Sequence, residues 1–285
     1  MLSYRHAFHA GNHADVLKHY VLGLVLAHAK QKDKPFWYID THAGAGMYSL
    51  SEGYATQNAE FEQGIDKLIT ATDLPKPLVD FVAQIKSFNT GNTLDLYPGS
   101  PAIAQDYLRA DDKMRLFELH PNDYKILIEN FKGQGQYKNS QTKIEMQDGF
   151  AGIKAYLPPP PRRAVVLIDP PYEDKQDYQR VVNCIKDSLN RFATGTYMVW
   201  YPLLQRDEPD EMIENLMQLN VPSWLHVAMT IHAPSEDGYG MHGSGLFIIN
   251  PPWTLPHTLA ETMPILTKLL ALDDAADYLL ESQIT

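Results

Sequence analysis

The sequence predicts an α/β protein with a mostly parallel, seven-stranded sheet and helices on both of its faces. Short apolar runs typical of buried strands alternate along the chain with segments of helical spacing, which is the pattern of parallel sheets. Several runs end in acidic or glycine-containing turns, as strands do at the ligand-binding edge of such sheets. The last two runs fit a reversed final pair. The predicted strands lie near residues 36–40, 114–119, 144–150, 164–168, 196–201, 225–231 and 245–249.

Start and stop signals predict the helices between these strands. Asn12 is suited to cap a helix over 12–29, and Lys34-Pro35 follows its end. Ser100 before Pro101 predicts another helix, over 100–109, with the serine as N-cap and the proline at the first helical position. Two further helices are predicted, over residues 178–191 and 209–219.

We expect the chain to form a single domain over residues 1–285. Within it, residues 1–34 form an N-terminal substrate and cofactor segment. Residues 50–96 form an inserted helical subdomain, because helical patterns at 60–70 and 78–88 separate the first strand from the rest of the fold.

Amino-acid composition and net charge limit the functions and the cellular location that we expect for the protein. The net charge of −11 argues against tight, non-specific binding to nucleic acid, since phosphate contacts dominate such affinity. Basic residues nevertheless outnumber acidic ones within 1–34, which is compatible with a brief, selective contact with RNA. The apolar stretch at 21–29 is too short to span a bilayer, and the lone Cys184 fits a reducing cytoplasm. We therefore expect a cytoplasmic protein without membrane contact.

The most informative motif is Asp169-Pro170-Pro171-Tyr172, which follows the apolar run 164–168. Proline fixes its own φ and restricts the residue before it, so Asp169 and the Pro170 carbonyl form a fixed pair of acceptors. Tyr172 can lie on the face of a displaced base, as aromatic side chains do around flipped nucleotides. The motif therefore indicates methylation of an exocyclic base amine, such as the N6 of adenine. A plain strand ending in a proline turn is the alternative.

A similar motif occurs at Asn250-Pro-Pro-Trp253. Only 35 residues follow Asn250, too few for three more strands with connections of usual length. We therefore take Asp169 as the site and Asn250 as a turn after a late strand.

Three more strand ends carry candidate ligands for a cofactor. Gly44 and Gly46 follow the first predicted strand, where small residues let backbone N–H groups approach a ligand. Glu118 ends the second strand and is a candidate for ribose hydroxyls, and Asp148 ends the third and is a candidate for a base amine. The glycine turn lacks the third glycine of a nicotinamide-cofactor site, which disfavours an oxidoreductase.

The histidine-rich start admits three interpretations. Its imidazoles together with Asp15 could bind zinc, but no cysteine accompanies them and we expect no metal. It could also be a polar helical face without a function. In the third interpretation it is a clamp for substrate and cofactor, with Tyr4 for stacking and Lys18 for a phosphate.

With these residues placed, the chain resembles class I S-adenosylmethionine-dependent methyltransferases, which have a Rossmann-like fold. More narrowly, it resembles the bacterial 23S ribosomal RNA adenine-N6 methyltransferase family. The resemblance covers nearly the whole chain. It is carried by the histidine-rich opening of residues 1–19 and by the segments 40–46, 97–101, 118–121 and 168–172.

The resemblance implies roles that spacing does not supply. Asp169 would be catalytic, with Pro170 and Tyr172 beside it, and Tyr4 would touch the substrate base, supported by His6 and Lys18. S-adenosylmethionine would be the methyl donor. Its contacts would come from the glycine turn and several strand ends, at His19, His42, Gly44, Ser100, Glu118, Asp148, Gly149 and Asp169.

The expected partner is 23S ribosomal RNA, naked or in a precursor particle, and the expected state is a monomer. One alternative is a DNA adenine-N6 methyltransferase, although residues 50–96 are short for a recognition domain. The other alternative is a non-catalytic RNA-binding protein that retains the fold. The presence of Asp169 and Glu118 disfavours it.

Overall fold

A computed structural model describes residues 6–51, 59–91, 93–132 and 141–285 of the chain. Its centre is an eight-stranded sheet in the order β10-β8-β9-β7-β6-β1-β4-β5. The predicted α/β class is confirmed, but the number of strands differs from the seven expected. The additional strand is β10 (Asp277–Gln283), which pairs antiparallel with β8 at the sheet edge. Its residues are mostly exposed, so the sequence there lacks the apolar run that marks a buried strand.

The parallel part of the sheet is built around β1 (Trp37–Asp40). On one side it pairs with β4 (Lys113–Phe117), which pairs with β5 (Thr142–Glu145). On the other side it pairs with β6 (Ala164–Ile168), which pairs with β7 (Thr196–Leu203). The reversed final pair is also confirmed, because β8 (Trp224–Thr230) and β9 (Gly243–Ile249) are antiparallel, and β9 runs antiparallel to β7.

Helices cover both faces of this sheet. The first face carries α1 (His13–Lys30), α4 (Lys76–Ser87), α5 (Ser100–Tyr107), α6 (Pro121–Lys132) and α10 (Leu255–Leu270). The second carries α7 (Gly149–Gly152), α8 (Gln176–Arg191) and α9 (Glu208–Met217). β6 is buried throughout, with Val165 and Leu167 on the first face and Val166 and Ile168 on the second. This two-sided burial explains its continuous apolar run.

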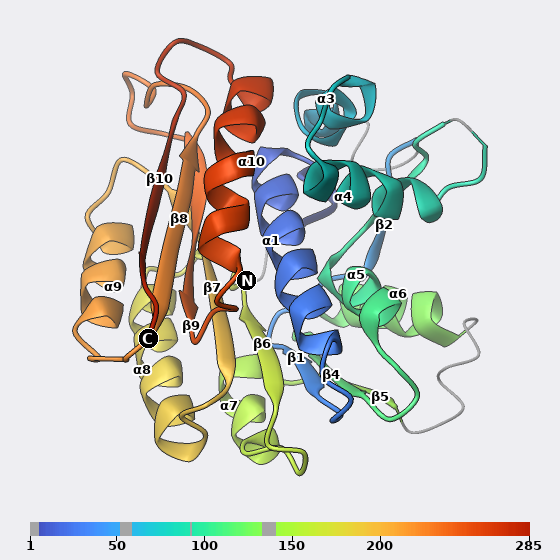
Figure 1. Ribbon diagram of the computed structural model, residues 1–285, viewed down its shortest axis with the longest axis vertical. Helices are drawn as coiled ribbons and strands as arrows, with labels where there is room; N and C mark the ends of the chain where they lie inside the picture. The colour runs from blue at the N-terminus through green and yellow to red at the C-terminus, as the bar shows by residue number, and fades with distance from the viewer. Residues whose placement is uncertain (1–5, 52–58, 92, 133–140) are drawn as a thin grey trace.

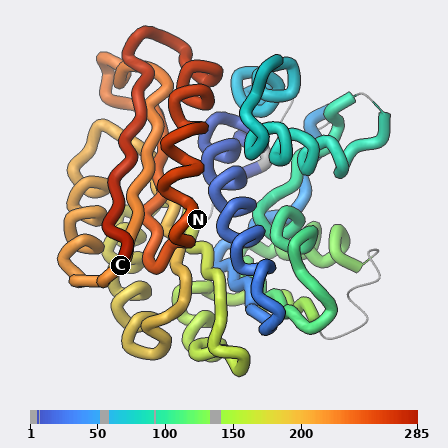
Figure 2. Tube along the Cα trace, in the orientation of Figure 1, coloured from blue at the N-terminus to red at the C-terminus, as the bar shows by residue number. Residues whose placement is uncertain are grey.

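The helix α1 comes from the start of the chain and α10 from near its end, yet they lie side by side against the sheet (Figure 1, Figure 2). Asn12 caps α1 as predicted, because its Oδ1 accepts hydrogen bonds from the amides of Ala14 and Asp15. No helix in the described ranges is long and apolar enough to span a bilayer.

The region predicted as a helical insertion contains three helical elements. They are the short 3-10 helix η2 (Glu60–Gln63), α3 (Ile65–Thr70) and α4. A second 3-10 helix, η1 (His6–Phe8), precedes α1, and a third, η4 (Ile153–Tyr156), follows α7. Outside the main sheet, β2 (Met47–Ser49) pairs antiparallel with β3 (Leu96–Pro98).

Candidate active site

A pocket of about 400 Å³ opens at the carboxyl ends of β1, β4, β6 and β7. These parallel strands all end at the same edge of the sheet, so the residues that follow them converge there. Asp169 and Pro170 follow β6 and line the pocket, and the side chain of Asp169 is 14% exposed. Asn250 lies elsewhere, after β9, where its amide donates to the carbonyls of Ala193 and Gly195.

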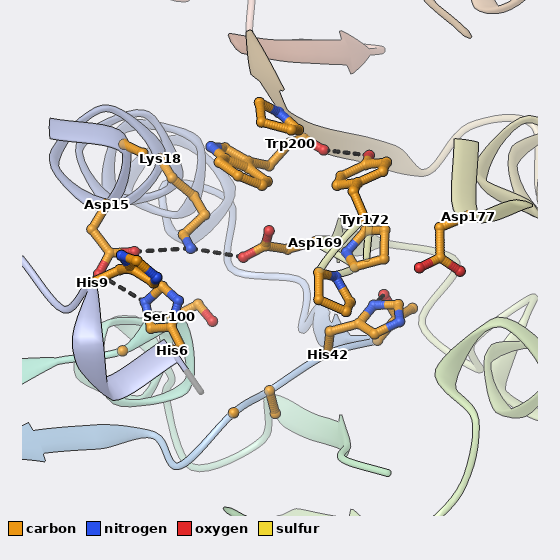
Figure 3. Close-up of a pocket in the computed structure, with 18 of the residues that line it drawn as sticks. His6, His9, Asp15, Lys18, His42, Ser100, Asp169, Tyr172, Asp177 and Trp200 are labelled. Atoms are coloured by element: carbon orange, nitrogen blue, oxygen red, sulfur yellow. Dashed lines mark hydrogen bonds and ion pairs between the residues drawn. The ribbon is translucent and has the colours of Figure 1, made fainter. Parts of the chain in front are cut away.

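A chain of charged and polar side chains connects the N-terminal segment to Asp169 (Figure 3). His6 Nε2 lies 2.9 Å from Asp15 Oδ2, and Lys18 Nζ lies 2.9 Å from Asp15 Oδ1. Lys18 Nζ also donates to Asp169 Oδ2 at 2.7 Å. The amide of Gly11 donates to Asp15 as well, at 3.0 Å. Three groups therefore hold the carboxylate of Asp15, and Lys18 bridges it to Asp169.

Asp15 and Lys18 stabilise each other's charged form, although both side chains are buried. Burial alone would lower the pKa of Lys18, but the negative charges of Asp15 and Asp169 outweigh it and raise that pKa. Burial alone would raise the pKa of Asp15, but His6 and the Lys18 ammonium beside it hold that pKa well below its ordinary value. At neutral pH Lys18 is therefore a buried ammonium, and it lies between the side chains of Asp15 and Asp169.

The aromatic residue of the motif, Tyr172, is only 4% exposed. Its hydroxyl donates to the Trp200 carbonyl at 2.6 Å, and its ring centroid lies 4.5 Å from that of Tyr178. Most of the ring is thus covered by protein, although Tyr172 does line the pocket. Half-buried Trp200 lies beside it on β7, with Lys18 Nζ 5.5 Å from its ring centroid. Trp200 is a second aromatic at the pocket.

Glu118 lies directly after β4, as its strand-end position predicted. Its carboxylate accepts hydrogen bonds from the amide of Gly44 at 2.8 Å and from that of His120 at 2.6 Å. Burial raises the pKa of this carboxyl to about 7, even though both amide hydrogen bonds lower it. Gly44 has a φ of +58°, and a Cβ there would lie 2.3 Å from the Tyr48 hydroxyl. The turn therefore requires glycine, which lets the backbone approach Glu118.

Asp148 caps the short helix α7, since its Oδ1 accepts from the Phe150 amide. Its other oxygen pairs with Arg180 from α8, which also pairs with Asp177. At Gly149 a Cβ would lie 1.9 Å from the Thr41 carbonyl oxygen. Any side chain there would therefore push the segment after β5 away from the segment after β1. Asp148 and Gly149 both line the pocket.

Ser100 is the first residue of α5 and Gly99 is its N-cap, so the predicted capping role of Ser100 was wrong by one position. The reason is that the hydroxyl of Ser100 donates to Asp40 Oδ2, at 2.6 Å, instead of accepting from the helix. Burial raises the pKa of Asp40 to about 6, despite the hydrogen bonds from Ser100 and Tyr38. Ser100 still lines the pocket.

Two pocket histidines are neutral at physiological pH. Burial lowers the pKa of both His19 and His42 to about 3. His19 is 1% exposed and its Nδ1 lies 2.9 Å from the Tyr97 hydroxyl. His42 Nδ1 lies 2.8 Å from Thr41 Oγ1, and its ring packs edge-on against Phe150. Both can offer a neutral nitrogen to a ligand, but neither is a cation.

A family model described as ribosomal RNA large subunit methyltransferase D, RlmJ, matches residues 33–279 of the chain. The chain belongs to this family. Among curated relatives, ribosomal RNA large subunit methyltransferase J of Escherichia coli (strain K12) is 46% identical over 264 residues, covering 93% of this chain and 92% of the relative. The protein with the same description from Haemophilus influenzae is 45% identical over 282 residues, covering 99% and 98%.

A crystal structure of a Legionella pneumophila protein shares the architecture. It has a TM-score of 0.87 and 34% sequence identity, and the match covers 96% of this chain and 98% of that one. The two proteins therefore share one fold over nearly the whole length of both chains. The class I methyltransferase fold that the resemblance implied agrees with it.

The structure adds residues to the pocket that the sequence did not single out there. Trp200, Arg180 and Asp177 line it, and Asp15, considered only as a possible metal ligand, holds Lys18 instead. Their signal in the sequence is weak because none of them directly follows a predicted strand, where the ligands of such a sheet are expected. Tyr4 lies outside the described residues. Within them, no cluster of histidine, cysteine, aspartate or glutamate is arranged to hold a metal ion.

Proposed function

We propose that this protein transfers a methyl group from S-adenosylmethionine to the N6 amine of an adenosine in 23S ribosomal RNA. Membership of the RlmJ family supports ribosomal RNA as the substrate class. The observation that carries the chemistry is Asp169 beside Pro170 at the pocket, next to Lys18. We further propose that the enzyme acts as a monomer on naked RNA or on a precursor particle.

The pocket residues fit the methyl donor. Glu118 has no cationic partner in the described part of the chain, and burial raises its pKa although two amides donate to it. Further hydrogen-bond donors would stabilise its ionised form. The two hydroxyls of a ribose would supply them. Asp148 follows the next strand and can accept from a base amine, as the adenine of the donor requires. The pocket volume lies within the usual range for small-molecule sites.

Asp169 and Pro170 act on the target adenine in this proposal. Lys18 occupies Asp169 Oδ2, and within the described residues the other carboxylate oxygen accepts no hydrogen bond. That oxygen and the Pro170 carbonyl can accept the two hydrogens of the adenine amine. The nitrogen lone pair is then free to leave conjugation with the ring. Bound S-adenosylmethionine would supply an electrophilic methyl group on its sulfonium, and the breaking carbon–sulfur bond would release S-adenosylhomocysteine as a neutral thioether.

The protein's part is positioning and electrostatic stabilisation. As the new carbon–nitrogen bond forms, the amine becomes acidic, and the Asp169 carboxylate can take its proton. No strong base is needed for this step, because proton loss follows the bond formation. His19 and His42, which are neutral, add no positive charge against the sulfonium.

The reaction can be tested directly with tritium-labelled S-adenosylmethionine. We expect the label in N6-methyladenosine when the substrate is 23S RNA from a strain that lacks its own enzyme. Duplex DNA containing the same adenosine context serves as the parallel substrate. Label in DNA alone would establish the DNA enzyme instead, and cofactor binding without label in either substrate would favour a non-catalytic RNA-binding protein.

The raised pKa of Glu118 predicts how donor binding depends on pH. The carboxyl is partly protonated at neutral pH and must be ionised to accept two ribose hydroxyls. Affinity is therefore complete above the pKa of about 7 and is lost as pH falls through it, by up to about tenfold per unit.

A suitable ligand for this measurement is 5′-methylthioadenosine, which carries no amino-acid group that titrates nearby. Calorimetry at pH 6 to 8 should show tighter binding with rising pH and proton release below pH 7. The Glu118→Gln variant should bind weakly with no such dependence. An equally steep pH dependence in that variant would assign the titration to another group.

A further inference from the structure

Two aromatic side chains are highly exposed to solvent, one near each end of β9. Tyr239 precedes the strand and is 79% exposed, and Trp253 follows it and is 74% exposed. They are the most exposed large apolar side chains among the residues that the structure describes. An aromatic ring that is exposed next to a substrate site is available to stack on a ligand, and burial of its apolar surface there would be favourable.

Only Tyr239 lies at the end of the sheet that holds the pocket. β9 runs antiparallel to β7, with Gly243 opposite Leu203, so β9 begins where β7 ends. The amide of His242 donates to the Leu203 carbonyl at 3.1 Å, and this hydrogen bond joins the segment before β9 to the end of β7. Met241, two residues after Tyr239, lines the pocket. Trp253 lies at the opposite end, about 20 Å away at the rise of an extended strand.

The turn that carries Tyr239 is held by its own hydrogen bonds. Gly238 and Gly240 have φ values of +75° and +93°, which favour glycine on both sides of the tyrosine. Asp237 Oδ1 accepts from the Tyr239 amide at 3.1 Å, and the Ser235 hydroxyl donates to the Tyr239 carbonyl. The backbone is therefore fixed while the ring faces solvent. A ring presented in this way loses little conformational entropy when it binds.

The segment that follows β7 lies beside this turn and carries an arginine. Arg206 follows β7 and lines the pocket, and it is exposed without an ion pair in the described parts of the chain. Its neighbour Gln205 lies close to the turn, where a Cβ added to Gly238 would be 3.4 Å from Gln205 Oε1. An exposed ring and an arginine on adjacent segments form the kind of combination that holds single-stranded nucleic acid. Because Glu236 and Asp237 make the turn itself acidic, stacking rather than charge must supply most of the affinity.

We propose that Tyr239 stacks on an unpaired base that neighbours the target adenosine in the substrate RNA, while Arg206 contacts the adjoining backbone. This inference rests on the proposed function and extends the substrate site from one displaced adenine to its single-stranded surroundings. Sequence-selective proteins recognise RNA mainly where bases are unstacked and can lie on aromatic rings. The pocket holds the reacting base, and the Tyr239 turn selects substrates with a free base beside it.

The test uses a synthetic RNA fragment that carries the target adenosine and is methylated by the wild-type enzyme. Tyr239→Ala is expected to raise KM for this RNA at least fivefold, with kcat and the affinity for S-adenosylmethionine unchanged. Tyr239→Phe, which keeps the ring, should behave like wild type. Trp253→Ala is the matched control, because it removes an equally exposed ring from the opposite end of β9, and it should have no effect.

A second substrate series separates stacking from a change in the loop. Each nucleotide flanking the adenosine is replaced in turn by an abasic one. At one position the wild-type enzyme should lose affinity by the same factor as Tyr239→Ala, and the variant should lose nothing further there. An unchanged KM in Tyr239→Ala, an equal loss in Trp253→Ala, or a variant defect that persists at every abasic position would each overturn the inference. Failure of the wild-type enzyme to methylate any RNA would instead count against the proposed function.

Discussion

Replacing Asp169 by asparagine is expected to lower the rate of methyl transfer by at least about 100-fold, the usual cost of losing one preorganised stabilising group. The amide keeps the shape of the carboxylate, but it puts N–H donors where the adenine amine needs acceptors. It also removes the negative charge that Lys18 pairs with at 2.7 Å. Single-turnover measurements with saturating S-adenosylmethionine report the methyl-transfer step apart from donor binding.

Asp73→Asn is the matched control for this substitution. Asp73 is exposed and has a φ of +59°, a backbone conformation that asparagine adopts as readily as aspartate. This variant should keep the full rate. Wild-type turnover by Asp169→Asn, in a protein with unchanged unfolding behaviour, would remove Asp169 from the mechanism.

The second large effect concerns Asp15, which holds Lys18 beside Asp169 and has no role of its own in the proposed transfer step. Asp15→Ala is expected to lower the free energy of unfolding by up to about 3–5 kcal/mol, the cost of breaking a buried ion pair. Lys18 would keep only Asp169 as a partner, and the buried Gly11 amide would lose its acceptor. The side chains of Asp15 and Lys18 are 1% and 5% exposed, so water cannot replace the lost interaction. Methyl transfer should fall as well, because Lys18 is no longer held in place beside Asp169. Urea unfolding and single-turnover rates measure the two effects.

Two further variants make this prediction specific. Asp80→Ala breaks the exposed pair of Asp80 with Lys76, whose side chains are 61% and 83% exposed, and it should cost under about 1 kcal/mol. The combination of Asp15→Asn with Lys18→Met removes both charges and should recover stability without recovering activity. A recovery of both would mean that the pair serves only the fold.

The same pair has a definite pH dependence. The pKa of Asp15 is depressed in the folded protein, so its contribution to stability is present above the ordinary value of 3.8 and is lost as pH falls through the folded pKa. The free energy of unfolding of the wild type should therefore decrease as pH falls through the folded pKa of Asp15. The variant that combines Asp15→Asn with Lys18→Met lacks this carboxyl and should not show this part of the decrease.

The strand-end positions could be predicted from the sequence because they depend on local rules. An apolar run stops where its strand leaves the core, and parallel strands end at one edge, so Glu118, Asp148 and Asp169 had to lie close together. The Asn12 cap and the proline turn after β6 are equally local. The choice of Asp169 over Asn250 depended only on how much chain remained for further strands.

The pairing of Lys18 with Asp169 was decided by tertiary structure alone. Helical spacing places Asp15 and Lys18 one turn apart, but it does not say which face of α1 packs over β6. Likewise, Arg180 reaches Asp148 only because α8 packs beside α7, and β10 forms only because an edge strand takes its hydrogen bonds from β8. The sequence therefore determined the fold class and the acids at the strand ends, which follow from neighbouring residues. The tertiary structure decided the charge bridge, the covered ring of Tyr172 and the place of Tyr239, because each depends on how distant segments pack.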